Sequence, residues 1–393
     1  MATILLSDLL GEQGQLTTFI DPNHLVVSPF VANASNLLLV DVNSAHDFAG
    51  ILLSANPSSN PFSYAGGVPI GGHITNIAFN DSSSNPLITV DGLDVDLAGV
   101  KTALSNHNLL DILRAVNGGN DSVVGSGVGD DLTIIPGAGN DSVYGGGGND
   151  KIDGGAGNDV LNGGAGADSL DGGLGKTGGL HDVADYSTST GPVQVSLVAG
   201  AIGKLNDAAG DKLVNIEDLT GSAFGDKLTG NTKANVILGG DGVDRILGGG
   251  GNDSINGGNQ KDSLYGGLGN DSIIGDLVAD HFVGSDLISG GAGNDLLTGG
   301  AGFDRFVFHA GDGNDTITDF KANSTDAKHL NQDHILTTQD IIDGFANNLD
   351  QKTLVADGVL LDFFDADHMH LGSILFEGVH SLAAIGISDF ALG

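Results

Sequence analysis

The sequence contains no cysteine, no tryptophan and only eight prolines among its 393 residues. Without cysteine, disulfide bonds cannot hold the fold together, and a cysteine nucleophile is excluded. Basic residues are also scarce, because 14 Lys and Arg stand against 50 Asp and Glu. The resulting formal charge of −36 disfavours binding to nucleic acid or to anionic membranes. The same charge opposes a compact fold unless cations neutralise it.

Long apolar runs and common catalytic motifs are missing as well. No apolar stretch approaches the roughly 18 residues of a transmembrane helix, and no segment is suited to pore formation. Residues Met1–Gly11 lack a basic segment, so we expect no cleaved N-terminal signal peptide. The His-Glu-x-x-His motif of zinc proteases and the Gly-x-Ser-x-Gly motif of lipases do not occur. We therefore expect no catalytic residues and favour a protein that acts by binding.

Glycine, in contrast, is abundant, with 66 residues, roughly one in six against an average of about 7%. Many of these glycines belong to the motif Gly-Gly-x-Gly-x-Asp, which often recurs after nine residues. The eight full copies begin at Gly145, Gly154, Gly163, Gly239, Gly248, Gly266, Gly290 and Gly299. A fixed period of this kind indicates one small structural unit stacked many times. We number the unit from its first glycine, so that the aspartate stands at position 6.

Degenerate copies extend the period and keep an acid at position 6 and an apolar residue at position 8. The position 6 residues of the first block are Asp121, Asp131, Asp141, Asp150, Asp159 and Asp168. Those of the second block are Asp226, Asn235, Asp244, Asp253, Asp262, Asp271, Asp280 and, after a six-residue shift, Asp286, Asp295, Asp304 and Asp315. The apolar residues run from Val143 to Ile317 and include Ile152, Ile246 and Phe282. They predict three-residue strands, each with its central side chain in a thin core. An unstructured linker would not keep an acid at position 6 and an apolar residue at position 8 over so many copies.

The pattern predicts an all-β protein built on a right-handed parallel β-roll. We expect a small, mostly β N-terminal domain over 1–116 and a first repeat block over 117–176. An interruption with degenerate coils follows over 177–220, then a second block over 221–318 and a C-terminal β cap over 319–393. The segments with strand-like composition are Leu37–Val40, His73–Phe79, Leu87–Val90, Val193–Val198, Leu213–Leu219, Gly358–Phe363 and Ser373–Phe376. Apolar spacing predicts a helix over Leu97–Val116.

The repeat also has the chemistry of a calcium site. Glycine permits positive φ and lets backbone carbonyls point inward in a tight turn. Ca²⁺ takes six to eight such hard oxygen ligands, whereas Mg²⁺ prefers a small, rigid octahedron. One turn supplies about half of a coordination shell, so two turns 18 residues apart are expected to share an ion. The expected neighbours are Asp141 with Asp159, Asp150 with Asp168, Asp244 with Asp262, and Asp253 with Asp271.

Residues 117–318 resemble the RTX nonapeptide repeats of hemolysin-type calcium-binding exoproteins. Gly313–Phe320 is similar to the exit from the roll in serralysin-type C-terminal domains. Asp389–Leu392, an acid followed by apolar residues, resembles an uncleaved type I secretion signal, with an additional Gly393. The resemblance implies export by a type I (ABC) secretion apparatus of a Gram-negative bacterium into the extracellular medium. The protein would remain unfolded at the low calcium concentration of the cytosol and fold outside.

The resemblance further implies that the carbonyls of positions 1 to 4 and the position 6 carboxylate bind Ca²⁺. In the first block these residues are Asp131, Gly137, Gly139, Asp141, Gly145, Gly146, Gly147, Gly148, Asp150, Gly154, Gly155, Ala156, Gly157, Asp159, Gly163, Gly164, Ala165, Gly166 and Asp168. In the second they are Gly239, Gly240, Asp241, Gly242, Asp244, Gly248, Gly249, Gly250, Gly251, Asp253, Gly257, Gly258, Asp262, Gly266, Gly267, Leu268, Gly269, Asp271, Gly290, Gly291, Ala292, Gly293, Asp295, Gly299, Gly300, Gly302, Asp304 and Asp315. Thr177, Asn235 and Gln260 depart from the motif, so weaker or empty sites are expected there.

The expected function is that of a secreted calcium-binding protein, non-enzymatic, for surface, matrix or host interaction. A cell-surface glycan or a host component is a possible partner of residues 1–116. One alternative is an extracellular hydrolase or other carbohydrate-active enzyme with an unrecognised N-terminal site. Another is a toxin-like, membrane-active RTX protein. His368 and His370 are a conceivable Zn²⁺ pair, although a polar turn is the favoured interpretation.

Overall fold

The computed structural model describes two compact units, residues 1–184 with 210–216, and residues 185–209 with 217–393. Up to residue 96 it describes strands only. Beyond that it describes residues 120, 122–125, 133–173, 181–276, 284–321, 333–337, 352–355, 358–364, 370–379, 385 and 390–392. The predicted helix Leu97–Val116 therefore lies outside the described residues, as do Asp121, Asp131, Thr177, Asp280, Phe282 and His368. Each unit is described below by itself.

The first unit begins with antiparallel strands. β3 pairs with β4, β4 with β7, β7 with β8, and β8 with β9. Their bounds are β3 Asn36–Leu39, β4 Phe48–Ser54, β7 His73–Asp81, β8 Pro86–Asp96 and β9 Ser122–Gly125. Two short antiparallel pairs are β1 Phe19–Ile20 with β2 Val26–Val27, and β5 Ser63–Ala65 with β6 Val68–Gly71. The three strands expected in this region are confirmed as β3, β7 and β8.

The repeats of the first unit form parallel sheets. β9 pairs with β12 in parallel, so the antiparallel N-terminal strands and the first repeats share one sheet. The strands on this side are β12 Ser142–Gly147, β15 Val160–Ala165 and β17 Val183–Asp185. The facing strands are β10 Thr133–Ile134, β13 Lys151–Asp153, β16 Ser169–Asp171 and β19 Lys212–Val214, and β11 Gly137–Ala138 pairs with β14 Gly155–Ala156. Residues 18 apart are neighbours, as in Val143 and Leu161.

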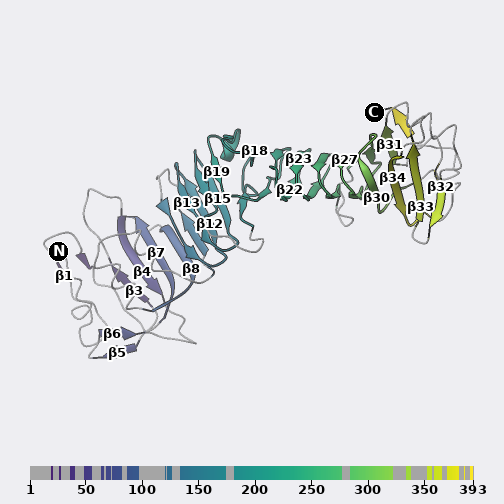
Figure 1. The fold of residues 1–393 in the computed structure, drawn as a ribbon. Helices are drawn as coiled ribbons and strands as arrows, with labels where there is room; N and C mark the ends of the chain where they lie inside the picture. Colours follow the sequence, from purple (N-terminus) through teal and green to yellow (C-terminus); the bar gives the residue numbers. More distant parts are fainter. Residues whose placement is uncertain are drawn as a thin grey trace. The chain divides into compact units, whose positions relative to one another are not determined.

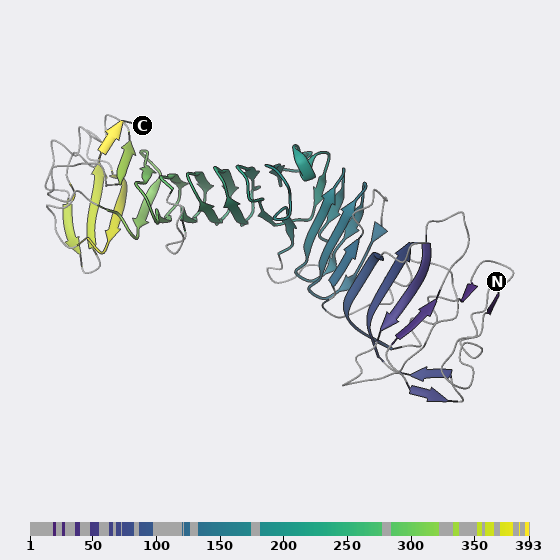
Figure 2. The ribbon, with the colours of Figure 1, turned by 180° about the vertical axis from the view of Figure 1, so that it is seen from behind.

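The second unit continues the same architecture with two parallel sheets (Figure 1). One holds β20 Asp218–Thr220, β22 Val236–Asp241, β24 Ser254–Asn259, β26 Ser272–Ile274, β28 Leu296–Thr298, β30 Gly313–Ile317 and β34 His370–Glu377. The other holds β18 Gln194–Ser196, β21 Lys227–Thr229, β23 Arg245–Gly250, β25 Ser263–Leu268, β27 Leu287–Ala292, β29 Arg305–Val307, β31 His334–Thr337 and β35 Phe390–Leu392. Figure 2 shows the stack of short strands from behind.

The C-terminal end of the second unit changes from parallel to antiparallel pairing. β34 lies parallel to β30 on one side and antiparallel to β33 on the other. β33 Gly358–Phe364 pairs in turn with β32 Lys352–Val355. Within the described residues of both units the helical structure is one short 3₁₀ turn, Asn206–Ala208, and none of their helices is long and apolar enough to cross a membrane. The prediction of an all-β parallel β-roll with a β-rich N-terminal region and a C-terminal β cap is confirmed.

One apolar side chain per nonapeptide forms the core, as predicted. The strands after each turn bury their central residue, which is at most 2% exposed in every case. These residues are Val143, Ile152, Leu161, Leu170, Leu228, Ile237, Ile246, Ile255, Leu264, Ile273, Ile288, Leu297, Phe306 and Ile317. Aromatic rings close the core at the C-terminal end, where the centroids of Phe320 and Phe376 lie 4.7 Å apart. Such a narrow core buries little apolar surface per residue, so the turns contribute more to stability than in an ordinary domain.

The interruption at 177–220 keeps part of the stack, as expected. In the first unit, Val183 pairs with Val160, and Lys212 pairs with Ser169. In the second unit, β18 pairs with β21, and β20 pairs with β22. The strand-like segment Leu213–Leu219 is divided into β19 and β20, which belong to different units. The expected domain boundaries themselves remain predictions.

Candidate functional site

The turns between strands orient their backbone carbonyls in a regular way. Glycines at positions 2 and 4 have positive φ, for example 112° at Gly249 and 99° at Gly251. The position 2 carbonyl points at the next turn on the same edge, because a Cβ added to Gly267 would collide with the Gly249 oxygen. The position 1 carbonyl points the opposite way, and the Gly266 oxygen lies 2.7 Å from an ideal Cβ on Gly248. Carbonyls of two successive turns therefore face the space between them.

The aspartates at position 6 form a ladder along each edge. The Asp244 backbone N–H donates to Oδ1 of Asp262 over 2.7 Å, and the Asp253 N–H donates to Asp271 over 2.8 Å. The four predicted pairs of neighbours are all confirmed, because Asp141 also donates to Asp159 and Asp150 to Asp168. The ladder extends further through Asp159 to Asp182, Asp168 to Asp211, Asp226 to Asp244, Asn235 to Asp253, Asp262 to Asp286, Asp271 to Asp295, Asp286 to Asp304, Asp295 to Asp315 and Asp304 to Asp333.

Seven ladder carboxylates of the second unit have one oxygen without a hydrogen bond. These seven aspartates are at most 2% exposed. In each of them Oδ1 accepts the ladder bond, and Oδ2 is the oxygen without a hydrogen bond. The Oδ2 atoms without a hydrogen bond are those of Asp244, Asp253, Asp262, Asp271, Asp286, Asp295 and Asp304. That of Asp304 lies 3.8 Å from Lys321 Nζ. A buried carboxylate oxygen without a partner is strongly unfavourable, so it indicates a missing positive charge. A cation in the inter-turn space would meet this requirement.

The space beside these oxygens is shaped by the position 1 glycine. A Cβ on Gly266 would fall between Oδ2 of Asp271 and the carbonyl oxygen of Gly290. The same holds at Gly239, between Asp244 and the carbonyl of Gly257. Over the part of the chain that the structure describes, no three His, Asp or Glu side chains gather around one point. The ligands of each turn are thus mainly carbonyls with a carboxylate, a set that suits Ca²⁺.

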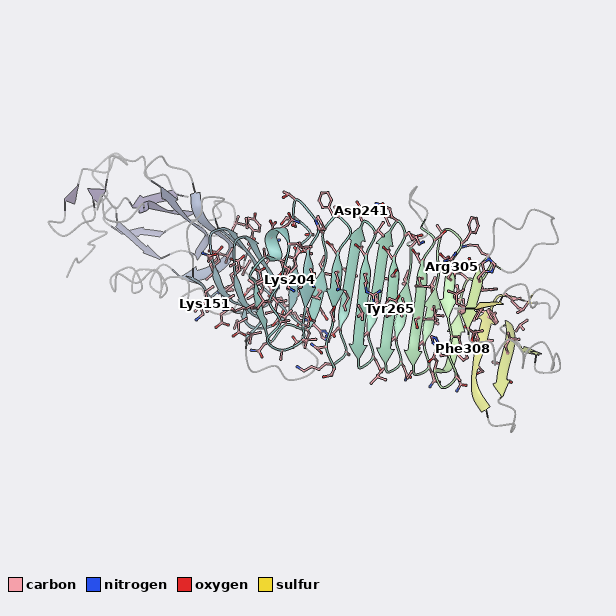
Figure 3. The ribbon with its side chains drawn as sticks, turned by 90° about the horizontal axis from the view of Figure 1, so that it is seen from above. Lys151, Lys204, Asp241, Tyr265, Arg305 and Phe308 are labelled. Atoms are coloured by element: carbon pink, nitrogen blue, oxygen red, sulfur yellow. The ribbon has the colours of Figure 1, made fainter. Side chains whose placement is uncertain are left out.

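The predicted ligand residues fall into this arrangement wherever the structure describes them. Position 3 contributes only its backbone, and its side chain points outward. Asp241 is an example, since it lies at an edge of the strands in Figure 3 and accepts a hydrogen bond from Asn259. Tyr265 lies on the sheet face in the same view, beneath the Arg245 guanidinium at 4.7 Å. Calcium binding by these residues remains a prediction, and Asp131 lies outside the described residues.

Two turns of the second unit are closed by their own hydrogen bonds. The Asn235 amide donates to the Glu217 carbonyl over 2.6 Å and accepts from the Asn231 N–H over 2.8 Å. Oδ2 of Asp226 accepts from the Ser222 backbone N–H over 2.5 Å. These side chains need no cation to satisfy their buried oxygens. The observation favours the prediction of a weak or empty site at Asn235 and extends it to Asp226.

Gln260 replaces a glycine at position 4, and the expectation of a weaker or empty site at its turn stays a prediction. The structure gives Gln260 φ 79°, in the left-handed region that the position 4 glycines also use. Its carbonyl points at the next turn, where it would collide with a Cβ on Gly284. The turn thus keeps its carbonyl pattern, at the cost of a strained backbone at one residue.

The acidic period does not lapse at Thr177. The next member of the ladder is Asp182, whose Oδ1 accepts the Asp159 N–H over 2.8 Å. Oδ2 of Asp182 lies beside Gly172, the position 1 glycine, as in a regular turn. The turn is simply longer, so its acid comes five residues late. The glycines Gly172 and Gly173, followed by His181-Asp182, are the sequence signal for it.

The six-residue shift has a similar explanation. Leu264 pairs with Ile288, and the Asp262 N–H donates to Asp286 over 2.8 Å. Asp286, and not Asp280, therefore follows Asp262 on its edge. The extra residues lie at position 3 of one turn, between Asp276 and Gly284. Asp276, which the motif did not reveal, is 1% exposed, and its Oδ2 accepts the Gly284 N–H over 2.9 Å.

Asparagines at position 5 form a second ladder that the sequence analysis missed. Each side-chain Oδ1 accepts the backbone N–H of the next position 5 residue on the edge. Asn252 accepts from Asn270 over 2.9 Å, and Asn270 from Asn294 over 2.7 Å. In the first unit Asn140 accepts from Asn158 over 3.0 Å. The recurrence of Asn before Asp was the available signal, and its effect is to keep successive turns in register.

Burial raises the pKa of the ladder carboxyls. The pKa is about 8 for Asp262, Asp286 and Asp315, about 7 for Asp244 and Asp304, and about 6 for Asp253 and Asp295. Removal from water is the largest cause, and neighbouring acids add to it in most of these groups. The ladder hydrogen bonds act in the opposite direction. Protons and calcium therefore compete for the same oxygens.

The calcium-free fold should be more stable at pH 5.5 than at pH 8.5. The pKa values of the ladder carboxyls in this fold lie above the unfolded value of 3.8, so the fold takes up protons at low pH and loses stability as the pH rises towards 8. In EGTA we expect a larger β-sheet signal at pH 5.5 than at pH 8.5, measured by far-UV circular dichroism. A spectrum in EGTA that does not change with pH would contradict the burial of these carboxyls in the calcium-free chain.

One family profile matches both repeat blocks. It describes the RTX calcium-binding nonapeptide repeat (4 copies), and it matches residues 133–161, 144–176, 220–255, 247–282 and 283–306. No curated protein matches the chain. Among solved structures the chain is similar to the crystal structure of the extracellular lipase LipA from Serratia marcescens, at 18% identity and a TM-score of 0.25. The similarity covers 67% of the chain and 39% of the lipase, so the chain spans about two fifths of that protein's length.

Proposed function

We propose that this chain, whose two repeat blocks are RTX calcium-binding nonapeptide repeats, is a secreted protein that folds when it binds Ca²⁺ outside the cell. The observation that carries the proposal is the row of buried Asp Oδ2 atoms without hydrogen-bond partners. Those of Asp244, Asp253, Asp262, Asp271 and Asp286 lie beside a backbone carbonyl of the next turn. Deprotonated and without a cation, such a row repels itself. With Ca²⁺ between the turns, the same oxygens become ligands, and the negative charge is offset.

Export before folding fits this chemistry. The cytosol holds little free Ca²⁺, so the repeats would stay unfolded there, and a type I exporter could pass the chain. Phe390–Leu392, part of the segment that resembles a secretion signal, forms strand β35 beside β31 in the folded protein. An exporter would therefore have to recognise this segment before the roll closes. Folding outside the cell then hides it and opposes backward movement.

The export proposal is tested by deletion of Asp389–Gly393 in a cell that expresses a type I exporter. We expect the truncated chain to remain in the cell, while the full chain appears in the medium. Because the deletion also removes β35, a variant with a damaged fold and an intact C-terminus is the matched control. Gly249→Ala is such a variant, because Gly249 has positive φ and its new Cβ would collide with the Asn231 carbonyl oxygen. It should still be exported. Secretion of the truncated chain at the normal level would refute the assignment of the signal.

We further propose that the protein acts by binding and not by catalysis. The support is the lack of zinc-protease, lipase and cysteine-nucleophile motifs in the sequence. The described part of the repeats supplies buried carboxylates and backbone carbonyls, which are groups that suit Ca²⁺. A panel of generic hydrolase substrates and a glycan array, both used with the full calcium-loaded chain, separate the two classes. Turnover of any substrate would overturn this part of the proposal.

A further inference from the structure

A lysine side chain contacts the last full copy of the motif, Gly299–Asp304. Lys321 Nζ donates to the Gly300 carbonyl over 2.5 Å and to the Gly302 carbonyl over 3.2 Å. It also lies 3.8 Å from Oδ2 of Asp304. These three oxygens belong to positions 2, 4 and 6 of the turn. The equivalent atoms face the inter-turn space in the turns Gly248–Asp253 and Gly266–Asp271.

The direction of the two carbonyls places the ammonium between this turn and the following coil. Position 2 and position 4 carbonyls point towards the next turn, as the Gly267 oxygen does towards Gly291, and the Gly269 oxygen towards Gly293. Lys321 belongs to the coil that follows Asp304. Its position thus matches the space that the proposed function assigns to an ion elsewhere.

The coil around Lys321 is held by the ladder bond and by further hydrogen bonds to Asp319 and Asp333. The Lys321 N–H donates to Oδ2 of Asp333 over 2.7 Å, and Oδ1 of Asp333 accepts the Asp304 N–H over 2.9 Å. The Gly299 and Gly300 N–H groups donate to the Asp319 carboxylate over 2.9 and 2.7 Å. Both Asp319 and Asp333 are therefore already hydrogen-bonded to this coil. Lys321 supplies the positive charge among these acids.

We propose that Lys321 is a covalently attached cation that takes the place of Ca²⁺ at the last full copy of the motif, Gly299–Asp304. The inference rests on the proposed function, because it assumes that the other regular turns bind the ion. An ammonium has a single positive charge and offers hydrogen bonds to carbonyl and carboxylate oxygens, so it meets the same ligands as a cation. The C-terminal coil therefore closes without calcium, whereas the turns before it require the ion. Lys321 determines which turn needs no calcium ion.

A simpler interpretation is an ordinary surface salt bridge between Lys321 and Asp304. The 3.8 Å separation of that pair is long, however, and the shortest contact is with a backbone carbonyl. A lysine that only paired with a carboxylate would have no reason to contact the carbonyls of positions 2 and 4 together. The two interpretations predict different numbers of bound ions once the charge is removed.

The test is the calcium stoichiometry of the full chain and of Lys321→Met, measured by equilibrium dialysis with ⁴⁵Ca²⁺. We expect the variant to bind one more Ca²⁺ per chain than the wild type, because removal of the ammonium exposes the turn's three oxygens. Lys227→Met removes one positive charge from a strand of the same unit and should leave the stoichiometry unchanged. Equal stoichiometry in the wild type and in a folded Lys321→Met variant would overturn the proposal.

A second measurement applies if Lys321→Met does not fold. Crystals of the wild-type protein grown with Ca²⁺ should show anomalous calcium peaks at the other regular turns of the second unit and none beside Gly300 and Gly302. A peak at that turn would overturn this inference and leave the proposed function intact. Calcium at no turn would overturn both.

Discussion

Chelation of calcium with EGTA should unfold the repeats of the second unit. In the fold the carboxylates of the ladder are at most 5% exposed, and seven have an oxygen without a hydrogen bond. Each ion that binds only the folded state adds about 1.4 kcal/mol when free Ca²⁺ is ten times its Kd. The six such turns other than that of Lys321 would together contribute about 8 kcal/mol, which is comparable to the stability of a whole domain.

The measurement is far-UV circular dichroism of the full chain in EGTA and during titration with Ca²⁺. We expect the β-sheet signal to be largely lost in EGTA and to return in a cooperative transition. Titration with Mg²⁺ is the matched control, because the smaller ion keeps its waters and does not suit a site of carbonyls. Identical spectra with EGTA and with calcium would contradict both the calcium assignment and the view that the thin core is insufficient by itself.

Replacement of Gly249 by alanine should destabilise the calcium-loaded fold by about 2 kcal/mol or more. Gly249 has φ 112°, a conformation that L-residues rarely adopt, and its new Cβ would collide with the Asn231 carbonyl oxygen. Backbone cannot move aside as a flexible side chain can, so the neighbouring turn has to shift. Because Gly249 itself lies in the turn of Asp253, whose Oδ2 lacks a hydrogen bond, the calcium midpoint should rise as well.

The adjacent glycine provides the control for this prediction. Gly250 occupies position 3, its φ is not positive, and a Cβ there would meet no atom closer than 3.7 Å. Gly250→Ala should therefore change the free energy of unfolding by no more than about 0.5 kcal/mol. Both variants are compared by thermal unfolding in saturating Ca²⁺. Equal stability of the two variants would show that position 2 does not require glycine for its positive φ.

The regular part of the fold follows from the sequence because its causes are local. Positive φ at positions 2 and 4, an acid at position 6 and an apolar residue at position 8 act within one nonapeptide. Their recurrence was sufficient to predict the parallel roll, the buried position 8 side chains and the pairing of Asp244 with Asp262. The resemblance to RTX repeats added the ligand, and the family profile confirms that resemblance for the repeat blocks.

The irregular parts required the tertiary structure. Asp182 and Asp286 continue the ladder 23 and 24 residues after their partners, and Asp333 follows Asp304 after 29. No local rule states how many residues can be inserted into a turn before its aspartate. The position of that aspartate depends on which backbone N–H of the preceding turn needs an acceptor. The same holds for the antiparallel pairing of β8 with β9, which joins the N-terminal strands to the repeats.

The sequence by itself determined the repeated unit, its calcium chemistry and the all-β class. Only the tertiary structure decided which aspartate belongs to each irregular turn. It also decided which positive charge lies at the turn Gly299–Asp304. A periodic motif specifies bonds between equivalent positions of neighbouring coils. Lys321 lies outside the motif, and its approach to Gly300 spans 21 residues of chain with no repeat relation between them. Contacts of this kind arise from three-dimensional packing alone.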